Sequence, residues 1–187
     1  MQRARSIRQD IDRILVTQQQ IADRVSEMAN EISAELMSLE GDSEIVLLPI
    51  MTGSVIFVAD LMRQLPMRLR IDVVTVSSYT GLSKKSQGAR LRDKIPESIR
   101  GQHVLVIDDI LDSGSTIRLI RSELENLGVR SMRSCMLLRK TIPSAMATPC
   151  EYVGFDIPDE FVVGYGLDYN GYYRNLPDIC VLKADAH

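Results

Sequence analysis

Hydrophobic positions in the first part of the chain repeat with the period of an amphipathic helix. Thr17 and Gln20 have the spacing of a capping box, in which two side chains bond backbone N–H groups at a helix start. Apolar residues then follow at intervals of three or four positions: Ile21, Val25, Met28, Ile32 and Leu36. This spacing predicts one helix with a buried face, ending near Gly41.

Farther along the chain, short apolar runs alternate with helical patterns. Strands are predicted at 44–51, 70–78, 103–108 and 132–138. A helix is predicted after Gly53, and the residues expected to share its face are Val55, Val58, Ala59 and Met62. Another is predicted at 115–127, with Gly128 as its stop. The alternation predicts an α/β fold with a central, mainly parallel sheet flanked by helices, which binds ligands at the carboxyl ends of its strands.

Two segments lack a clear period. Residues 79–93 are polar and contain Gly81 and Gly88, so we expect a long loop that serves as a lid, or else a plain surface insertion. From about residue 150 to 187, short β-like pieces are separated by Gly and Pro. We expect this tail to form a small hood beside the sheet edge, within one domain that spans residues 1–187.

Composition narrows the classes of protein. A chain of 187 residues with 45% hydrophobic content can bury one sizeable core. A net charge of -3 argues against nucleic acid as the main partner. The three cysteines show neither a disulfide framework nor zinc-ligand spacing. We expect a cytoplasmic protein, because no secretory signal and no membrane-spanning run is present.

The most informative segment couples an apolar strand to acidic residues and a polar turn. Asp108 and Asp109 follow the strand 103–108, and the turn 112–116 reads Asp-Ser-Gly-Ser-Thr before a helix. Backbone N–H groups, hydroxyls and a helix amino terminus at one point suit a phosphate. The two carboxylates could accept hydrogen bonds from sugar hydroxyls or hold a divalent cation. A helix cap with favourably placed acids is the simpler reading, but it explains poorly three carboxylates beside a buried strand.

This segment resembles the motif that binds phosphoribosyl pyrophosphate (PRPP) in type I phosphoribosyltransferases. The resemblance implies that Asp108 and Asp109 contact the ribose hydroxyls. It implies that the turn binds the 5-phosphate through Asp112, Ser113, Gly114, Ser115 and Thr116. Asp112 would also be the general base that faces the purine N7. The activity would require Mg²⁺.

The tail 153–177 is similar to the carboxyl-terminal hood of hypoxanthine-guanine phosphoribosyltransferases, and the likeness extends from about Ile45 to Lys183. It implies that Phe161 stacks on the purine and that the backbone of Val162 meets the base edge. Lys140 would donate to the 6-oxo group. An ammonium suits a 6-oxo acceptor and not the 6-amino group of adenine, so the expected base is a 6-oxopurine.

The same resemblance assigns further residues. Asp168 would help to bind magnesium, together with Asp108 and Asp109, and Arg174 would contact pyrophosphate. Ser78 and Tyr79 correspond to the start of the lid. The family also leads us to expect a homodimer or homotetramer.

One loop departs from the family pattern. Many relatives have Leu-Lys-Gly where this chain has Met51-Thr52-Gly53, in a loop whose backbone meets pyrophosphate. If the loop is retained, a non-proline cis peptide should join Met51 and Thr52. Thr52 offers a hydroxyl but no charge, which would weaken PRPP binding unless the family lysine serves a subunit interface or loop packing instead.

Two other functions remain open at this point. A xanthine-preferring enzyme would share nearly all of these motifs. A nucleotide-sensing regulator with the same fold would bind RNA or DNA, and the acidic composition counts against it.

Overall fold

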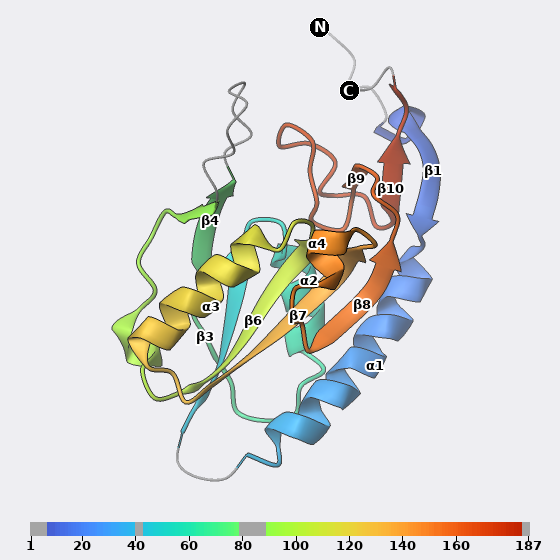
Figure 1. Ribbon diagram of the computed structural model, residues 1–187. Coiled ribbons are helices and arrows are strands. Elements are labelled where there is room, and N and C mark those ends of the chain that lie inside the picture. The colour runs from blue at the N-terminus through green and yellow to red at the C-terminus, as the bar shows by residue number, and fades with distance from the viewer. Residues whose placement is uncertain (1–6, 40–42, 79–88, 185–187) are drawn as a thin grey trace, which may run out of the picture.

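A mainly parallel sheet forms the centre of the computed structural model, which describes residues 7–39, 43–78 and 89–184 (Figure 1). The strand order is β5-β4-β2-β6-β7-β8, and β3 pairs with β2. The strands are β2 (Ile45–Met51), β3 (Arg70–Ile71), β4 (Val74–Ser78), β5 (Ala89–Leu91), β6 (His103–Leu111), β7 (Ser131–Lys140) and β8 (Tyr152–Ile157). All pairs are parallel except β4 with β5. The predicted α/β fold is confirmed.

Helices cover both faces of this sheet. They are α1 (Gln18–Leu36), α2 (Val55–Met62), α3 (Ser115–Leu127) and α4 (Pro143–Met146). Residues of α1 and α2 share a buried cluster with Leu105 and Ile107 of β6. The alternate positions Val104 and Val106 pack with α3 on the opposite face. Because successive side chains of a strand point to opposite faces, a continuous apolar run is what a sheet covered on both sides requires.

The capping box and the buried face of α1 are confirmed. Thr17 Oγ1 accepts the backbone N–H of Gln20 at 3.3 Å, and Gln20 Oε1 accepts that of Thr17 at 2.9 Å. All five apolar residues of the predicted face are buried. The predicted end near Gly41 was wrong, because α1 ends at Leu36 and its C-cap is Met37.

The predicted face of α2 was also wrong. Phe57, Val58 and Leu61 are buried, whereas three of the four residues expected on that face are exposed: Val55, Ala59 and Met62. Nearly every residue of this short helix is apolar, so helical spacing fits more than one face. Packing against α1 and the sheet selects the buried one.

Several strand boundaries differ from the predictions. The strand predicted at 70–78 is divided into β3 and β4. Asp72 and Val73, between them, have no paired residue in β2, although the Asp72 N–H donates to Leu47 O at 3.0 Å. The predicted loop 79–93 contains β5, which pairs with β4, while 79–88 lie outside the described residues. β6 runs to Leu111, three residues beyond the predicted end, because β7 pairs with it that far. Asp108 and Asp109 therefore lie within a strand.

A smaller sheet joins the two ends of the chain in the order β1-β10-β9. Its strands are β1 (Ile11–Val16), β9 (Val162–Val163) and β10 (Ile179–Leu182). β1 was not predicted, and the first strand of the tail, β8, belongs to the central sheet. Short 3-10 helices occupy Ile7–Asp10 and Glu97–Ile99. Among the described residues, no helix has the length and apolar character needed to cross a membrane.

His103 is the first residue of β6 and lies at the amino-terminal end of the parallel strands. Its side chain is 7% exposed, and its Nδ1 lies 2.6 Å from Ser131 Oγ. Its Nε2 is buried without a hydrogen-bond partner among the residues described. Burial lowers the pKa of His103 below 6.5, and the charges of Arg130 and Arg133 lower it further.

We predict that His103 makes the fold sensitive to mild acid. Below about pH 6.5 the unfolded chain binds a proton that the folded His103 resists, so the free energy of unfolding falls as the pH falls. His103→Gln lacks this proton, and its loss of stability between pH 7 and 5 should be shallower by up to about 1.4 kcal/mol per pH unit. Urea unfolding of both proteins across this range measures the difference, and parallel curves would refute it.

Candidate active site

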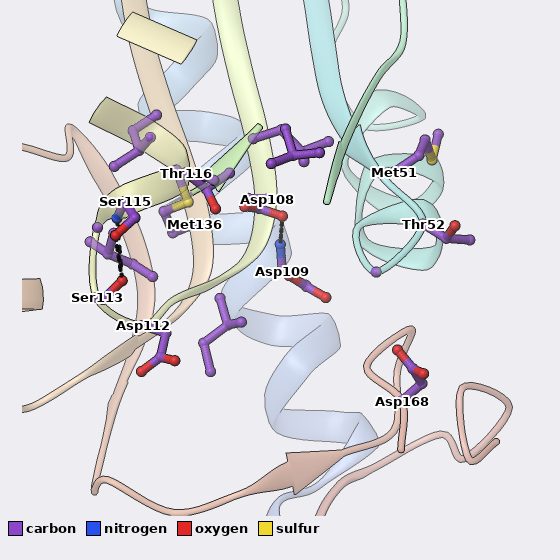
Figure 2. A pocket seen from close by; sticks show the side chains of 18 of the residues that line it. Met51, Thr52, Asp108, Asp109, Asp112, Ser113, Ser115, Thr116, Met136 and Asp168 are labelled. Atoms are coloured by element: carbon purple, nitrogen blue, oxygen red, sulfur yellow. Dashed lines mark hydrogen bonds between the residues drawn. The ribbon is translucent and has the colours of Figure 1, made fainter. Parts of the chain in front are cut away.

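A cavity of about 630 Å³ opens at the carboxyl ends of the central strands. Figure 2 shows Asp108 and Asp109 of β6 between the turn that precedes α3 and the Met51–Thr52 loop, with Asp168 facing them from the hood. The lining contains these predicted site residues: Thr52, Gly53, Asp108, Asp109, Asp112, Ser113, Gly114, Ser115, Thr116, Asp168 and Arg174. These residues come from three separate segments, the loop after β2, β6 with the turn that follows it, and the hood, and the fold brings them around one space.

Asp108 and Asp109 carry the strongest electrostatic perturbation of the site. The Asp108 side chain is 9% exposed, and its Oδ1 accepts the backbone N–H of Asp109 at 3.0 Å. Burial raises the pKa of Asp108 well above its usual range, and repulsion from Asp109 adds to this. Burial raises the pKa of Asp109 as well. A ligand that brings hydroxyl donors or a cation would stabilise the ionised pair.

The turn between β6 and α3 is shaped to receive an anion. Gly114 caps α3 with φ 79°, and a Cβ there would lie 2.2 Å from Thr148 Oγ1. The Ser113 and Ser115 hydroxyls are 2.9 Å apart. Arg118 braces the turn by donating to Ser113 O at 3.0 Å and to Thr148 Oγ1 at 2.9 Å. The Ser113 and Ser115 hydroxyls and the first backbone N–H groups of α3 therefore lie together in a braced turn.

The loop after β2 contains the predicted non-proline cis peptide between Met51 and Thr52, so that prediction is confirmed. A Cβ on Gly53 would lie 1.7 Å from Asp109 Oδ2, so any other residue here would displace this carboxylate. A Cβ on Gly166 would in turn lie 2.1 Å from Gly53 O. The hood, the loop and Asp109 are therefore in direct contact.

Asp168 and Arg174 of the hood form an ion pair at the rim of the cavity. Arg174 Nη2 is 2.6 Å from Asp168 Oδ1, and its Nη1 donates to Gly166 O. Asp168 Oδ2 accepts the Gly171 N–H at 2.7 Å. The predicted metal ligand and the predicted pyrophosphate ligand are thus held against each other.

The carboxylates at the cavity fit a cation that is held partly by its substrate. Among the described residues, no group of three or more His, Cys, Asp or Glu side chains forms a metal cage. Mg²⁺ is usually bound by one or two carboxylates together with substrate phosphate oxygens. Asp108 and Asp109, with Asp168 across the cavity, could supply such carboxylates to a cation that also binds substrate oxygens.

Lys140 lies at the end of β7 between two carboxylates. Its Nζ is 3.2 Å from Asp112 Oδ1 and 2.9 Å from Asp159 Oδ1. Burial lowers the pKa of Lys140, but the hydrogen bond to Asp159 and the charge of Asp112 outweigh it, and the net pKa is raised. The sequence prediction missed Asp159. In the sequence, Asp159 is marked only as an acidic residue two positions before Phe161. Its contact with Lys140 becomes evident only when β7 and β8 are paired.

None of the three predicted purine-binding residues, Lys140, Phe161 and Val162, is among the residues that line the cavity. Phe161 is 48% exposed, and its ring meets that of Tyr169 edge to face, with centroids 5.6 Å apart. Val162 is buried in β9. Phe161 and Val162 adjoin Asp159 in sequence, so the segment that contacts Lys140 leads directly into them.

The predicted lid is only partly within the described residues. Ser78 ends β4, where its backbone is opposite Ala89, and Tyr79 lies outside the described part of the chain. Val76 and Ala89, on either side of this point, both line the cavity. The described ends of the predicted lid therefore border the site.

Comparisons with known proteins cover almost the whole chain. A family model described as a phosphoribosyl transferase domain matches residues 13–170. The hypoxanthine-guanine phosphoribosyltransferase of Mycobacterium avium is 38% identical over 92% of this chain and 86% of its own. The crystal structure of a hypoxanthine phosphoribosyltransferase from Staphylococcus aureus superposes with a TM-score of 0.86, at 33% identity and 99% coverage of both chains.

A further solved structure contains a reaction product. It is a variant of the Trypanosoma cruzi hypoxanthine phosphoribosyltransferase complexed with IMP. Its TM-score is 0.83 and its identity 32%, and the match covers 94% of this chain and 92% of the other.

Proposed function

The chain belongs to the phosphoribosyl transferase family, and we propose that it transfers the 5-phosphoribosyl group of PRPP to hypoxanthine or guanine, giving IMP or GMP and pyrophosphate. Relatives at 36–38% identity carry the names of this activity. The observation that carries the proposal is the position of Lys140 beside Asp112. The Lys140 ammonium, a donor suited to a 6-oxo group, thereby lies next to Asp112, the candidate general base, and next to the cavity proposed for the sugar phosphate.

The cavity offers a separate group for each part of PRPP. Asp108 and Asp109 would accept hydrogen bonds from the ribose hydroxyls, which supports ionisation of this buried pair. The turn residues would bind the 5-phosphate: Asp112, Ser113, Gly114, Ser115 and Thr116. Thr52, Gly53 and Arg174 would contact pyrophosphate, and for this Arg174 must exchange its ion pair with Asp168 for the ligand.

The base would be bound between the turn and the hood. Lys140 donates to the 6-oxo group, Phe161 stacks on the ring and the Val162 backbone meets its edge. As N9 attacks C1 of the ribose, the C1–oxygen bond to pyrophosphate breaks with its electron pair on the leaving group. Asp112 accepts the N7 proton, which prevents positive charge from remaining on the purine.

Magnesium is part of this proposal. Asp168, Asp108 and Asp109 would hold it together with substrate oxygens, and its charge would offset that of the departing pyrophosphate. The lid that starts at Ser78 and Tyr79 would exclude water, because hydrolysis of PRPP competes with transfer. We further propose a cytoplasmic homodimer or homotetramer in which residues 1–187 form one domain.

A substrate panel tests the proposal. PRPP should support turnover of hypoxanthine and guanine, and not of adenine or uracil, in spectrophotometric assays with magnesium. EDTA should abolish the reaction. Turnover of xanthine alone would contradict the assigned base. No turnover of any base, combined with RNA or DNA binding in a gel shift at physiological salt, would instead favour a regulator.

Asp112→Asn tests the general base. The amide keeps the size of the side chain but cannot accept a proton, so kcat should fall by about 10²- to 10⁴-fold. The KM for PRPP should change little, since the turn binds phosphate mainly through backbone and hydroxyl groups. A kcat near that of the wild type would leave Asp112 with a binding role only.

Thr52→Lys tests the departure from the family loop. Thr52 is exposed and lines the cavity. A charge-assisted hydrogen bond contributes about 1.5–3 kcal/mol against about 1 for a neutral one, so the KM for PRPP should fall several-fold and depend more on salt. Thr52→Met, which adds length without charge, is the control. An unaltered KM for PRPP in a folded Thr52→Lys variant would mean that the loop binds through its backbone alone.

A further inference from the structure

We propose that Asp159 of the hood is a positioning residue that orients the Lys140 ammonium toward the base and prevents Asp112 from capturing it. This role rests on the proposed function, because it concerns the 6-oxo donor of that reaction. Asp159 Oδ1 is 2.9 Å from Lys140 Nζ, closer than Asp112 Oδ1 at 3.2 Å. The hood therefore provides the nearer of the two carboxylates.

The backbone fixes Asp159 and Lys140 relative to each other. Lys140 ends β7 and pairs with Ile157, the last residue of β8. The next peptide N–H, of Thr141, donates to Ile157 O at 2.8 Å. Two residues later the chain turns tightly, with the Glu160 N–H donating to Pro158 O at 2.8 Å. Asp159 lies inside this turn, so its approach to Lys140 is set by the ladder and not by a long flexible segment.

The exposed fractions of the three side chains show that Lys140 is confined, whereas both of its carboxylate partners face solvent. Lys140 is 14% exposed, whereas Asp159 is 62% and Asp112 59% exposed. A confined ammonium has three N–H donors, and two carboxylates leave one for a 6-oxo acceptor. Because opposite charges attract at this range, the ammonium lies where the pulls of the turn and of the hood balance.

Loss of the Asp159 charge would upset this balance. Lys140 would pair with Asp112 alone and be drawn toward the phosphate turn, away from the segment that leads into Phe161. The donor would then meet the 6-oxo group in a poorer geometry. The effect should fall on 6-oxopurine binding and turnover. The KM for PRPP should change little, because the phosphate turn, although it contains Asp112, would bind mainly through backbone N–H groups and hydroxyls.

The experiment compares Asp159→Asn with a neighbouring control, Glu160→Gln. Glu160 is also a hood carboxylate, but it pairs with Arg13 of β1. For each protein we would measure the KM for PRPP, the kcat and KM for hypoxanthine, and the inhibition constant of unsubstituted purine, which lacks the 6-oxo group. Thermal unfolding checks the fold.

In Asp159→Asn, kcat/KM for hypoxanthine should fall about tenfold, with the KM for PRPP within about twofold of the wild type. Purine inhibition should be unchanged, so the preference for hypoxanthine over purine also falls about tenfold. Asp159→Glu should restore part of the loss, and Glu160→Gln should behave like the wild type.

Three results would overturn the role, and they differ from a failure of the proposed function. An unchanged hypoxanthine kcat/KM in Asp159→Asn would refute it directly. Equal weakening of hypoxanthine and purine, or a raised KM for PRPP, would show a structural effect instead. If the wild type itself did not turn over hypoxanthine, the proposed function would fall, and this role with it.

Discussion

The position of two adjacent carboxylates in β6, the buried Asp108 and the half-buried Asp109, is the constraint on which the rest of the site depends. Their raised pKa values show that the protein alone compensates their charge poorly. The neighbouring backbone fits tightly around them. Gly53 lies against the Asp109 carboxylate, and Gly166 of the hood lies against Gly53. The loop and the hood are therefore packed closely around the Asp109 carboxylate.

The same strand and the turn after it create the opposite electrostatic character a few residues away. Asp108 and Asp109 offer acceptors, whereas the turn 113–116 offers N–H groups, hydroxyls and a helix amino terminus. Arg118 stabilises the turn by donating a hydrogen bond to Ser113 O, so the guanidinium has a structural role. A ligand with hydroxyls at one end and phosphate at the other therefore has one favourable orientation in the cavity.

Local patterns in the sequence predicted the features that depend on neighbouring residues. The capping box of α1, the end of α3 at Gly128 and the acidic strand with its turn all fall into this class. The cis peptide at Met51–Thr52 came from family resemblance and not from the residues themselves. The face of α2 could not be predicted, because an almost wholly apolar helix has no unique spacing. β1 was missed because β10, at the other end of the chain, stabilises it.

The half of the site that we propose binds the base differs from the half proposed to bind the sugar phosphate in how the sequence specifies it. The residues proposed for the ribose and the 5-phosphate, 108–116, form one continuous run of chain, so their chemistry can be predicted from neighbouring residues in the sequence. The base half exists only after β7 and β8 pair and bring Lys140 beside Asp159. Lys140 also bonds Asp112, so one ammonium connects the two halves. A substitution in the turn or in the hood must therefore alter the electrostatic field at the Lys140 ammonium. Base selection cannot be understood from the hood alone.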